Sequence, residues 1–343
     1  MAKKNIGIIG AGMIGDVHIG NIHKDGRGQI SWIATKTDKT LQEKLAKFNI
    51  PNGTLDYNEM LADKNLDAVV IAAPPFLHLK MFEAALKAGK HIVMEKPLAT
   101  NIGDVKKMVE LADQYPDSMV LECSCRHARL QPKFDFIKKI IDDGKLGEVY
   151  HIHHNAATRG TFIEWNPEGT WALDKEKAGG GPFVDWGVYD FSFHLGLLND
   201  EPKLETCNSF TKTGMKILSN LNLKSNIEEH GAAYMKFDTG LTYYYERGAG
   251  VHFEVPNRTR IYGTKGGLEF GFCSWDPIEV EFYYIDENGR EKQQTLQIIN
   301  PEDHDDDFAF TKHFLDCLVD GVKPRMTIKM AAKHLDIIYK ILK

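Results

Sequence analysis

The sequence lacks the features of membrane, nucleic-acid-binding and secreted proteins. No apolar stretch approaches the roughly 18 residues that a transmembrane helix needs, and the formal net charge is −6 without a long basic run. Met1–Lys4 lead directly into a strand-like segment without an apolar leader. We therefore expect a soluble, cytoplasmic protein with no membrane or nucleic-acid partner.

Cysteine is also scarce. The 343 residues include five cysteines, an odd number, and Cys123 and Cys125 are too close together for a Cys-x-x-Cys redox pair. A disulfide framework is therefore not expected. The rest of the composition, 43% hydrophobic and 26% charged, is that of a globular chain long enough for two domains.

The first motif is a glycine-rich turn between a strand and a helix. Asn5–Ile9 has the composition of a buried strand, and Gly10–Gly15 follows the pattern Gly-x-Gly-x-x-Gly before a helix-like stretch. In a dinucleotide-binding fold, Gly10 permits the tight turn, Gly12 lets a pyrophosphate approach the backbone, and Gly15 lets helix and strand pack closely. This order predicts a Rossmann domain.

The end of the second strand bears on the choice of cofactor. Ile30–Ala34 is strand-like, and an NAD-binding domain would place an acidic residue near its end to hold the ribose. The sequence has Thr35, Lys36 and Thr37 instead, which offer a cation and hydroxyl groups to the 2′-phosphate of NADP. Asp38 follows at once and is the alternative ribose ligand. We therefore favour NADP and keep NAD open.

Two further strands end in residues suited to a ligand site. Leu66–Ala73 stops at Pro74, where small residues and prolines leave room for a flat ring. The next apolar run stops at Glu95 and Lys96, followed by Pro97, which restricts Lys96 to an extended conformation. Ligands of open α/β sheets bind at the carboxyl ends of the strands, so Lys96 is expected to face a crevice. A surface ion pair is the alternative.

Together these motifs resemble the glucose-fructose oxidoreductase, inositol dehydrogenase and rhizopine-catabolism (Gfo/Idh/MocA) family. The resemblance rests on the glycine turn, on Ala73-Pro74-Pro75 with His78, on Ala88-Gly89-Lys90-His91 and on Glu95-Lys96-Pro97. It implies a Rossmann domain with a doubly wound parallel sheet over residues 1–124, and an α+β domain with a large, mainly antiparallel sheet over 125–343. The residues expected to contact the cofactor are Gly10, Gly12, Met13, Ile14, Gly15, Thr35, Lys36, Thr37, Ala73, Pro74, His78, Glu95, Lys96 and Arg126.

A second signature follows in the second domain. Gly179–Gly181 precede a helix-like run in which Asp185 and Tyr189, four residues apart, share one face. Alone, this pattern favours a glycine hinge followed by a core helix whose tyrosine is buried. It is similar to the family's second signature, with Tyr189 where many members carry histidine, as in the branch of glucose-fructose oxidoreductase and the dimeric dihydrodiol and xylose dehydrogenases. His194 is a lesser acid/base candidate.

Other residues of this domain are candidates for the substrate site. The three histidines of Val149–Asn155 alternate between the faces of a strand, so no metal is predicted. Arg159, Trp165 and Trp171 stand in a loop-like stretch, where tryptophans either cap a core or offer apolar faces to a sugar ring. Together with His194 they are our candidate substrate contacts.

The rest of the chain predicts mainly strands from about Glu205 to Gln297 and two closing helices. The acidic run Glu302–Asp307 suits a loop and helix start. In the family, the outer face of this sheet makes oligomer contacts, so we expect a homodimer or homotetramer. The consecutive tyrosines Tyr243–Tyr245 suit such an interface, or they alternate between core and surface.

These inferences predict an oxidoreductase that transfers a hydride between a secondary alcohol of a sugar, glycoside or cyclic polyol and a nicotinamide cofactor. Lys96 and Tyr189 form the acid/base pair, and Asp185 holds a neighbouring hydroxyl. Two alternatives remain. One is a redox-assisted glycosidase, which the tyrosine form of the signature disfavours, and the other is a catalytically silent sugar or nucleotide sensor.

Overall fold

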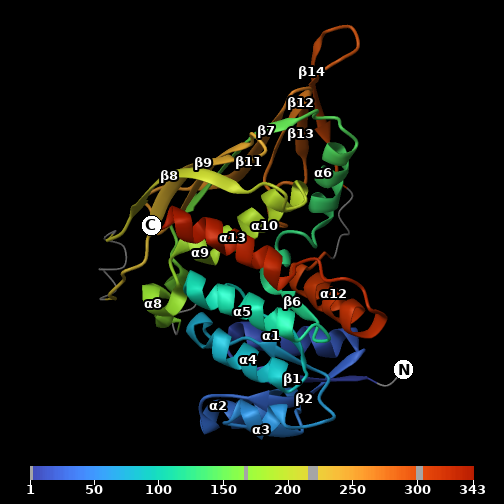
Figure 1. The fold of residues 1–343 in the computed structure, drawn as a ribbon, viewed down its shortest axis with the longest axis vertical. Coiled ribbons are helices and arrows are strands. Elements are labelled where there is room, and N and C mark those ends of the chain that lie inside the picture. Colours follow the sequence, from blue (N-terminus) through green and yellow to red (C-terminus); the bar gives the residue numbers. More distant parts are fainter. Residues whose placement is uncertain (1–2, 166–168, 215–222, 299–303) are drawn as a thin grey trace. The chain divides into compact units, whose positions relative to one another are not determined.

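The computed structural model describes residues 3–165, 169–214, 223–298 and 304–343 (Figure 1). Contacts divide the chain into two compact units. Unit 1 comprises Met1–Arg126 and Asp305–Lys333, and unit 2 comprises His127–His304 and His334–Lys343. The sequence predicted one boundary at 124/125, whereas the structure returns residues 305–333 to the first unit.

Unit 1 contains a six-stranded parallel sheet with the order β3-β2-β1-β4-β5-β6. Its strands are β1 (Lys4–Ile9), β2 (Gly28–Ala34), β3 (Asn52–Thr54), β4 (Ala68–Ile71), β5 (His91–Met94) and β6 (Val120–Glu122). The strand order reverses between β1 and β4. Doubly wound sheets bind ligands at such a switch point, so the predicted Rossmann architecture is confirmed together with the edge at which to look for a site.

Several helices of unit 1 begin where a polar side chain accepts a hydrogen bond from a backbone N–H group of the first turn. Thr37, Asp56 and Asn101 accept hydrogen bonds from the first turns of α2, α3 and α5. The helices are α1 (Met13–Asp25), α2 (Asp38–Phe48), α3 (Tyr57–Leu61), η1 (Pro75–Leu77), α4 (His78–Lys87), α5 (Ile102–Gln114), η2 (Cys123–Cys125) and α12 (Asp306–Asp320).

The acidic run does start a helix, because Asp305 caps α12 by accepting from the N–H groups of Asp307 and Phe308. Glu302 and Asp303 lie outside the described residues. α12 packs against α1, and an ion pair of 2.7 Å between Arg27 Nη1 and Asp316 Oδ1 ties the end of α12 to the start of β2. This packing explains why residues 305–333 belong to unit 1.

Unit 2 contains an eight-stranded sheet with the order β14-β13-β12-β11-β7-β10-β9-β8. Its strands are β7 (Val149–Thr158), β8 (Leu204–Lys212), β9 (His230–Phe237), β10 (Thr242–Ala249), β11 (Val255–Gly263), β12 (Gly266–Phe270), β13 (Val280–Ile285) and β14 (Glu291–Leu296). All neighbours are antiparallel except β7 and β10, which are parallel. The predicted α+β domain with a mainly antiparallel sheet is confirmed.

Side chains along the central strands alternate between two environments. His154 is fully buried while His151 and His153 are half-buried, and Tyr243 and Tyr245 are fully buried on either side of the half-buried Tyr244. The tyrosines therefore alternate between core and surface, and only Tyr244 faces outward with the two half-buried histidines.

A short helix lies in the core of unit 2. Every residue of α10 (Gly187–Leu197) is buried, and its one charged residue, Asp190, accepts hydrogen bonds from Tyr245 and Arg247 inside the core. The other helices are α6 (Pro132–Asp142), α7 (Phe162–Trp165), η3 (Thr170–Leu173), α8 (Lys175–Ala178) and α9 (Pro182–Asp185), and α13 (Ile328–Ile341) is divided between the units after Lys333.

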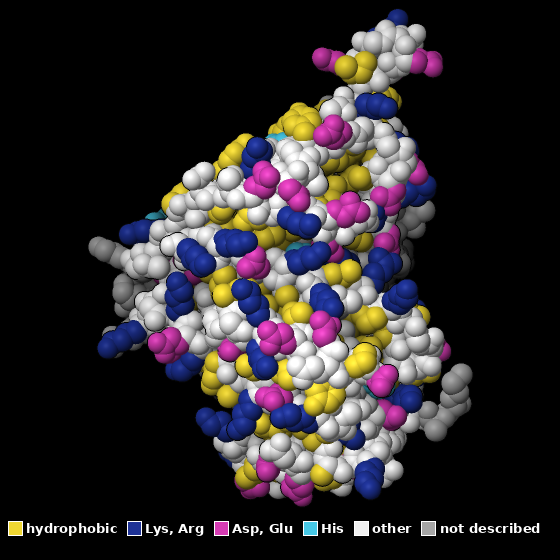
Figure 2. Space-filling view, viewed as in Figure 1, with side chains coloured by type: hydrophobic (Ala, Val, Ile, Leu, Met, Phe, Trp, Pro, Cys, Tyr) yellow, Lys and Arg dark blue, Asp and Glu magenta, His cyan; other side chains and the backbone are white. Residues whose placement is uncertain are grey.

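The surface mixes charges of both signs. On the face drawn in Figure 2, lysine and arginine side chains are interspersed with aspartate and glutamate. Within the described ranges, none of the helices combines the length and hydropathy of a membrane span.

Candidate active site

The three glycines of the first turn meet three different constraints. Gly10 has φ +99°, and a Cβ there would lie 2.6 Å from the carbonyl oxygen of Ala72. A Cβ on Gly15 would lie 2.4 Å from the carbonyl oxygen of Gly10, whereas a Cβ on Gly12 would meet nothing within 4 Å. The open position at Gly12 stands at the N-terminus of α1, where backbone N–H groups favour an anion. The turn therefore fits a dinucleotide pyrophosphate.

The residues after β2 divide into buried and exposed groups. Thr35 is buried, and its hydroxyl donates to the carbonyl of Thr37 at 3.0 Å. The hydroxyl of Thr37 caps α2 by accepting from the N–H of Thr40. Lys36 is exposed between them, and Asp38 is the exposed first residue of α2. A cation and a carboxylate are thus both presented at this strand end, and the geometry alone leaves NADP and NAD open.

The turn after β4 is held by a hydrogen bond to a buried histidine. His78 is fully buried, and its Nε2 lies 2.7 Å from the carbonyl oxygen of Ala73 while its Nδ1 lies 3.0 Å from that of Pro97. It thus links the turns after β4 and β5. We assign His78 to positioning the Ala73-Pro74 turn rather than to direct cofactor contact, because its ring has no exposed surface.

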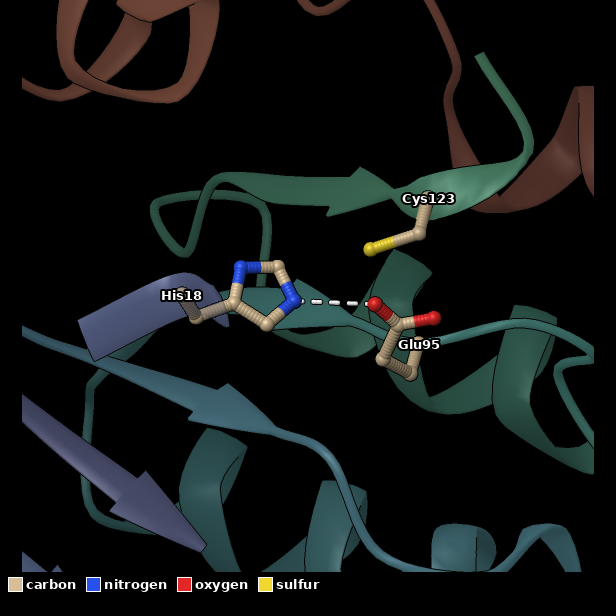
Figure 3. A group of neighbouring side chains, drawn as sticks. All are labelled: His18, Glu95 and Cys123. Carbon is tan, nitrogen blue, oxygen red and sulfur yellow. Dashed lines mark hydrogen bonds and ion pairs between the residues drawn. The ribbon is translucent and has the colours of Figure 1, made fainter. Parts of the chain in front are cut away.

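Glu95, the residue after β5, is held in a buried ion-pair network. Its Oε1 accepts from Nη1 of Arg126 at 2.9 Å and lies 2.8 Å from Nε2 of His18. Burial disfavours the carboxylate, but Arg126, His18 and Lys96 outweigh it and hold the pKa of Glu95 well below its usual range. Figure 3 shows the His18 ring directed at Glu95 from α1, with the Cys123 sulfur beside them. Glu95 and Arg126 therefore fix the strand end that carries Lys96.

His18, Glu95 and Cys123 also bring possible metal-ligand atoms within 4.8 Å of one another. This is the one such group found among the described residues. The donor set does not fit a cation. Burial raises the pKa of the Cys123 thiol well above its usual range, and the Glu95 oxygen that would bind a metal already accepts from the Arg126 guanidinium. The group is an ion-pair network.

A second buried carboxyl group lies at the same edge of the sheet. Met94 of β5 pairs with Glu122 of β6, so Glu122 ends its strand where Lys96 follows β5. Glu122 is 1% exposed and accepts from the backbone N–H of Ser124 at 2.7 Å. Burial raises its pKa to about 7, with the charge of Glu95 adding to the shift and Ser124 and Lys96 opposing it. Lys96 is half-buried and precedes a cis peptide bond to Pro97.

The glycine triplet of the second signature allows the backbone at Glu228 to pass close to Gly181. A Cβ on Gly181 would lie 1.9 Å from the carbonyl oxygen of Glu228. The buried Glu228 carboxylate accepts from the N–H groups of Gly181, at 2.8 Å, and Phe183, at 3.2 Å. These bonds satisfy the start of α9, and burial raises the pKa of Glu228. The triplet is required by packing, whatever else it does.

Asp185 and Tyr189 lie on consecutive short helices rather than on one. α9 ends at Asp185, Trp186 is a junction with φ −102° and ψ −32°, and α10 begins at Gly187. A Cβ on Gly187 would lie 3.0 Å from the Tyr245 hydroxyl oxygen, so this glycine lets α10 approach β10 closely. Asp185 is half-buried and Tyr189 is 2% exposed. The expectation of one uninterrupted helix was wrong, because the helix is interrupted at Trp186.

Comparison with known proteins agrees with these features. The oxidoreductase family with an NAD-binding Rossmann fold matches residues 4–121, and the GFO/IDH/MocA C-terminal domain matches residues 134–269. The chain belongs to the Gfo/Idh/MocA family.

Relatives of this Gfo/Idh/MocA protein include curated enzymes and solved structures. Myo-inositol 2-dehydrogenase of Thermotoga maritima is 23% identical over 77% of this chain and 74% of its own length. The NADP(+) D-xylose 1-dehydrogenase of Haloarcula marismortui is 25% identical over 68% of this chain and 64% of its own length. The structure of levoglucosan dehydrogenase with NADH and levoglucosan matches 99% of this chain and 96% of that chain with a TM-score of 0.83 at 19% identity, which shows a shared fold.

One predicted substrate contact of this family member is placed elsewhere. His194 is fully buried, its Nε2 lies 2.9 Å from the Thr259 hydroxyl and its Nδ1 lies 2.6 Å from the Tyr243 hydroxyl. Burial lowers the pKa of His194 well below its usual range. With both ring nitrogens occupied inside the core, His194 is a packing residue, and we withdraw it as a substrate contact.

The remaining candidates lie before α8. Arg159 is exposed and its backbone N–H donates to Glu254 at 2.9 Å. Trp171 is half-buried in η3. Trp165 ends α7, and its side chain lies outside the described part of the chain. A role for these residues in substrate binding stays a prediction.

Sequence reasoning missed several residues that lie beside the predicted site residues of each unit. His18 and Glu122 join Glu95 in unit 1, and only the position of Glu122 at a strand end gave a signal. In unit 2, the His127 ring lies beside both Tyr189 and Trp275, although these residues are far apart in sequence.

Proposed function

We propose that this protein is a nicotinamide-dependent dehydrogenase that oxidises a secondary alcohol of a sugar, a glycoside or a cyclic polyol. The observation that supports this most is the construction of unit 1, in which an open glycine turn and a braced Lys96 stand at the carboxyl edge of one parallel sheet. The names of the relatives, which act on inositol, xylose and levoglucosan, support the substrate class.

Lys96 and Tyr189 are the proposed acid/base pair. Oxidation of an alcohol removes a proton from oxygen and a hydride from carbon, and a bound nicotinamide supplies the hydride acceptor. The chain must supply the proton acceptor and hold the hydroxyl. Lys96 follows a strand end fixed by Glu95 and Arg126, so its ammonium has a defined anchor. Tyr189 would bind the reacting hydroxyl, and Asp185 a neighbouring one.

NADP is the proposed cofactor, with NAD as the alternative. Its pyrophosphate would lie against Gly12 and the N-terminus of α1, and Lys36 would pair with the 2′-phosphate. Lys36→Ala should raise the Kd of NADPH about tenfold and leave that of NADH unchanged, since a charge-assisted contact of this kind contributes roughly 1–2 kcal/mol. Lys39→Ala, an exposed lysine three residues on, is the matched control. Equal effects on both cofactors would favour NAD.

A homodimer or homotetramer through the outer face of the second sheet completes the proposal. Tyr234 pairs with Tyr244 across β9 and β10, and Tyr262 pairs with His151 across β11 and β7. Tyr234 is 49% and Tyr262 38% exposed. Aromatic rows of this kind suit an interface. Light scattering should show an oligomer that Tyr234→Glu dissociates, and a monomeric wild type would refute this part.

The direct test is an absorbance scan near 340 nm with NADP or NAD and a panel of sugars, glycosides and inositols. Growth of the reduced-nicotinamide band with one substrate supports the dehydrogenase. A band present at the start and bleached only by a keto sugar indicates a retained cofactor. Aglycone release that requires cofactor supports the glycosidase, and sugar binding without a band supports the sensor.

Lys96→Ala tests the acid/base assignment. Because a positioned acid/base group contributes roughly 10²–10⁴-fold, turnover measured at saturating cofactor should fall by about 100-fold or more. Lys87→Ala, which removes an exposed lysine of α4, is the matched control and should retain activity. Near-normal turnover in Lys96→Ala would refute the assignment.

A further inference from the structure

Four aromatic rings of unit 2 form one group, and one of them belongs to Tyr189, the proposed acid/base residue. We call His127, Trp186, Tyr189 and Trp275 the aromatic cluster. The centroid of His127 lies 5.0 Å from Tyr189, 5.6 Å from Trp275 and 6.2 Å from Trp186. Trp186 lies 5.5 Å from Tyr189 and 5.7 Å from Trp275, which it meets edge to face at 89°. Each ring thus contacts at least two others at separations typical of favourable aromatic pairs.

The loop that carries Trp275 is clamped at both ends. It joins β12 to β13, and the buried Lys133 ammonium donates to the carbonyl oxygens of Gly271 and Pro277, at 2.5 and 2.9 Å. Inside the loop, Asp276 accepts from the N–H of Cys273 at 2.8 Å, and Phe272 is fully buried. Trp275 therefore stands at the tip of a fixed loop.

Trp186 is held by a contact with a buried arginine. The Arg247 guanidinium lies 5.3 Å from the Trp186 ring, within the range of a cation–π contact. Arg247 is itself locked by Asp190, to which both its Nε and Nη2 donate inside the core. The orientation of Trp186 is thus determined by a buried ion pair.

The cluster is rigid, yet one of its members is open to solvent. Trp275 is 61% exposed whereas Tyr189 is 2% exposed. A single exposed tryptophan is common on protein surfaces and needs no function. Trp275 differs because two neighbouring rings and a clamped loop hold it in one orientation, which removes most of the entropy cost of stacking a ligand on it.

We propose that Trp275, supported by Trp186, is a stacking platform for the C–H face of a ring-shaped sugar or cyclitol, and thereby a determinant of substrate specificity. The inference rests on the proposed role of Tyr189, because Trp186 and His127 link the platform to that residue. A closed ring presents a flat C–H face to an indole, whereas an open-chain polyol does not. The platform therefore selects rings over chains that carry the same hydroxyl groups.

The experiment compares Trp275→Ala, Trp275→Phe and Phe253→Ala with the wild type. Phe253 is 63% exposed in unit 2 and controls for the loss of any exposed ring. The enzyme is saturated with NADPH, so that no oxidation occurs, and is titrated with levoglucosan, myo-inositol and open-chain sorbitol by calorimetry. For a substrate that is turned over, KM and kcat are measured separately.

Trp275→Ala should raise the Kd or KM of the ring compound that binds by about tenfold, with a smaller effect on kcat, and Trp275→Phe should restore most of the loss. Phe253→Ala should bind the ring compound as tightly as the wild type does. In Trp275→Ala, the Kd of NADPH and the weak binding of sorbitol should stay unchanged. The platform is refuted if Trp275→Ala binds the ring compounds as tightly as the wild type does, or if it loses affinity equally for the ring compounds and for sorbitol. It is also refuted if the wild type binds no ring compound. A wild type that binds a ring without ever reducing cofactor would refute the dehydrogenase and leave the platform in place.

Discussion

Ionisation of Glu122 should lower the stability of the protein as the pH rises toward neutrality. The carboxyl group is 1% exposed and its Oε2 accepts from both the N–H and the hydroxyl of Ser124. Burial, with the nearby Glu95 charge, raises its pKa from an ordinary 4.5 to about 7, against the opposing effects of Ser124 and Lys96. The folded protein therefore retains a proton that the unfolded chain has already lost.

The size of the effect follows from proton linkage. Between the unfolded pKa of 4.5 and the folded pKa of about 7, the native state binds more protons than the unfolded state, so the free energy of unfolding falls as pH rises. Each pKa unit corresponds to about 1.4 kcal/mol, which gives a loss of about 3 kcal/mol across this window. The contribution is fully present below the unfolded pKa and is lost above the folded one.

Glu122→Gln isolates this contribution. The amide stays neutral and keeps an oxygen that can accept from Ser124, so the variant should gain on the wild type by about 3 kcal/mol in unfolding free energy between about pH 5 and pH 8. Urea unfolding at several pH values measures the difference. Glu110→Gln, which alters an exposed glutamate of α5, should give a flat difference. Parallel stability curves for wild type and Glu122→Gln would refute the reasoning.

Three further predictions concern other buried groups. Burial lowers the pKa of His313 from 6.5 to about 4, and its neutral ring accepts a hydrogen bond from the N–H of Arg325. The free energy of unfolding should therefore fall by about 3 kcal/mol as the pH drops from 6.5 to about 4. His313→Gln should abolish that dependence in acid unfolding curves. Thr259→Val removes a hydroxyl that lies 2.9 Å from each of two buried histidines, so urea unfolding should show a loss of about 1–3 kcal/mol; an unchanged midpoint would contradict the network. Gly12→Ala should change the melting temperature by no more than a few degrees but weaken NADPH binding by about tenfold. Gly15→Ala should instead destabilise the fold by about 1–3 kcal/mol. A destabilised Gly12→Ala with normal NADPH binding, or a fully stable Gly15→Ala, would contradict the assigned roles.

Local patterns in the sequence predicted the nucleotide unit well. The glycine pattern of Gly10–Gly15 can be read from six consecutive residues, and the structure shows that Gly10 and Gly15 leave no room for a Cβ. The strand end at Glu95 and Lys96 was predictable for the same reason, since an apolar run stopped by charges is local information.

Contacts between distant segments were not predictable in this way. His127 packs against both Tyr189 and Trp275, and no periodicity in the sequence indicates these contacts. His194 had the right residue type near the right motif, yet the register of α10 turned it into the core against Thr259. Whether a side chain faces the core or a ligand depends on tertiary packing, which short-range pattern does not contain.

The division of unit 1 into two stretches of chain affects how the protein folds during synthesis. Domains made from one continuous stretch can complete their folding as they leave the ribosome, N-terminal first. Here α12 packs against α1, and the Arg27–Asp316 ion pair closes a loop that contains all of residues 127–304. The nucleotide unit therefore cannot bury its α1 face until the second unit has been synthesised, and pays a loop-closure entropy that a continuous domain avoids. The cofactor unit is the first to begin folding and among the last parts of the chain to finish.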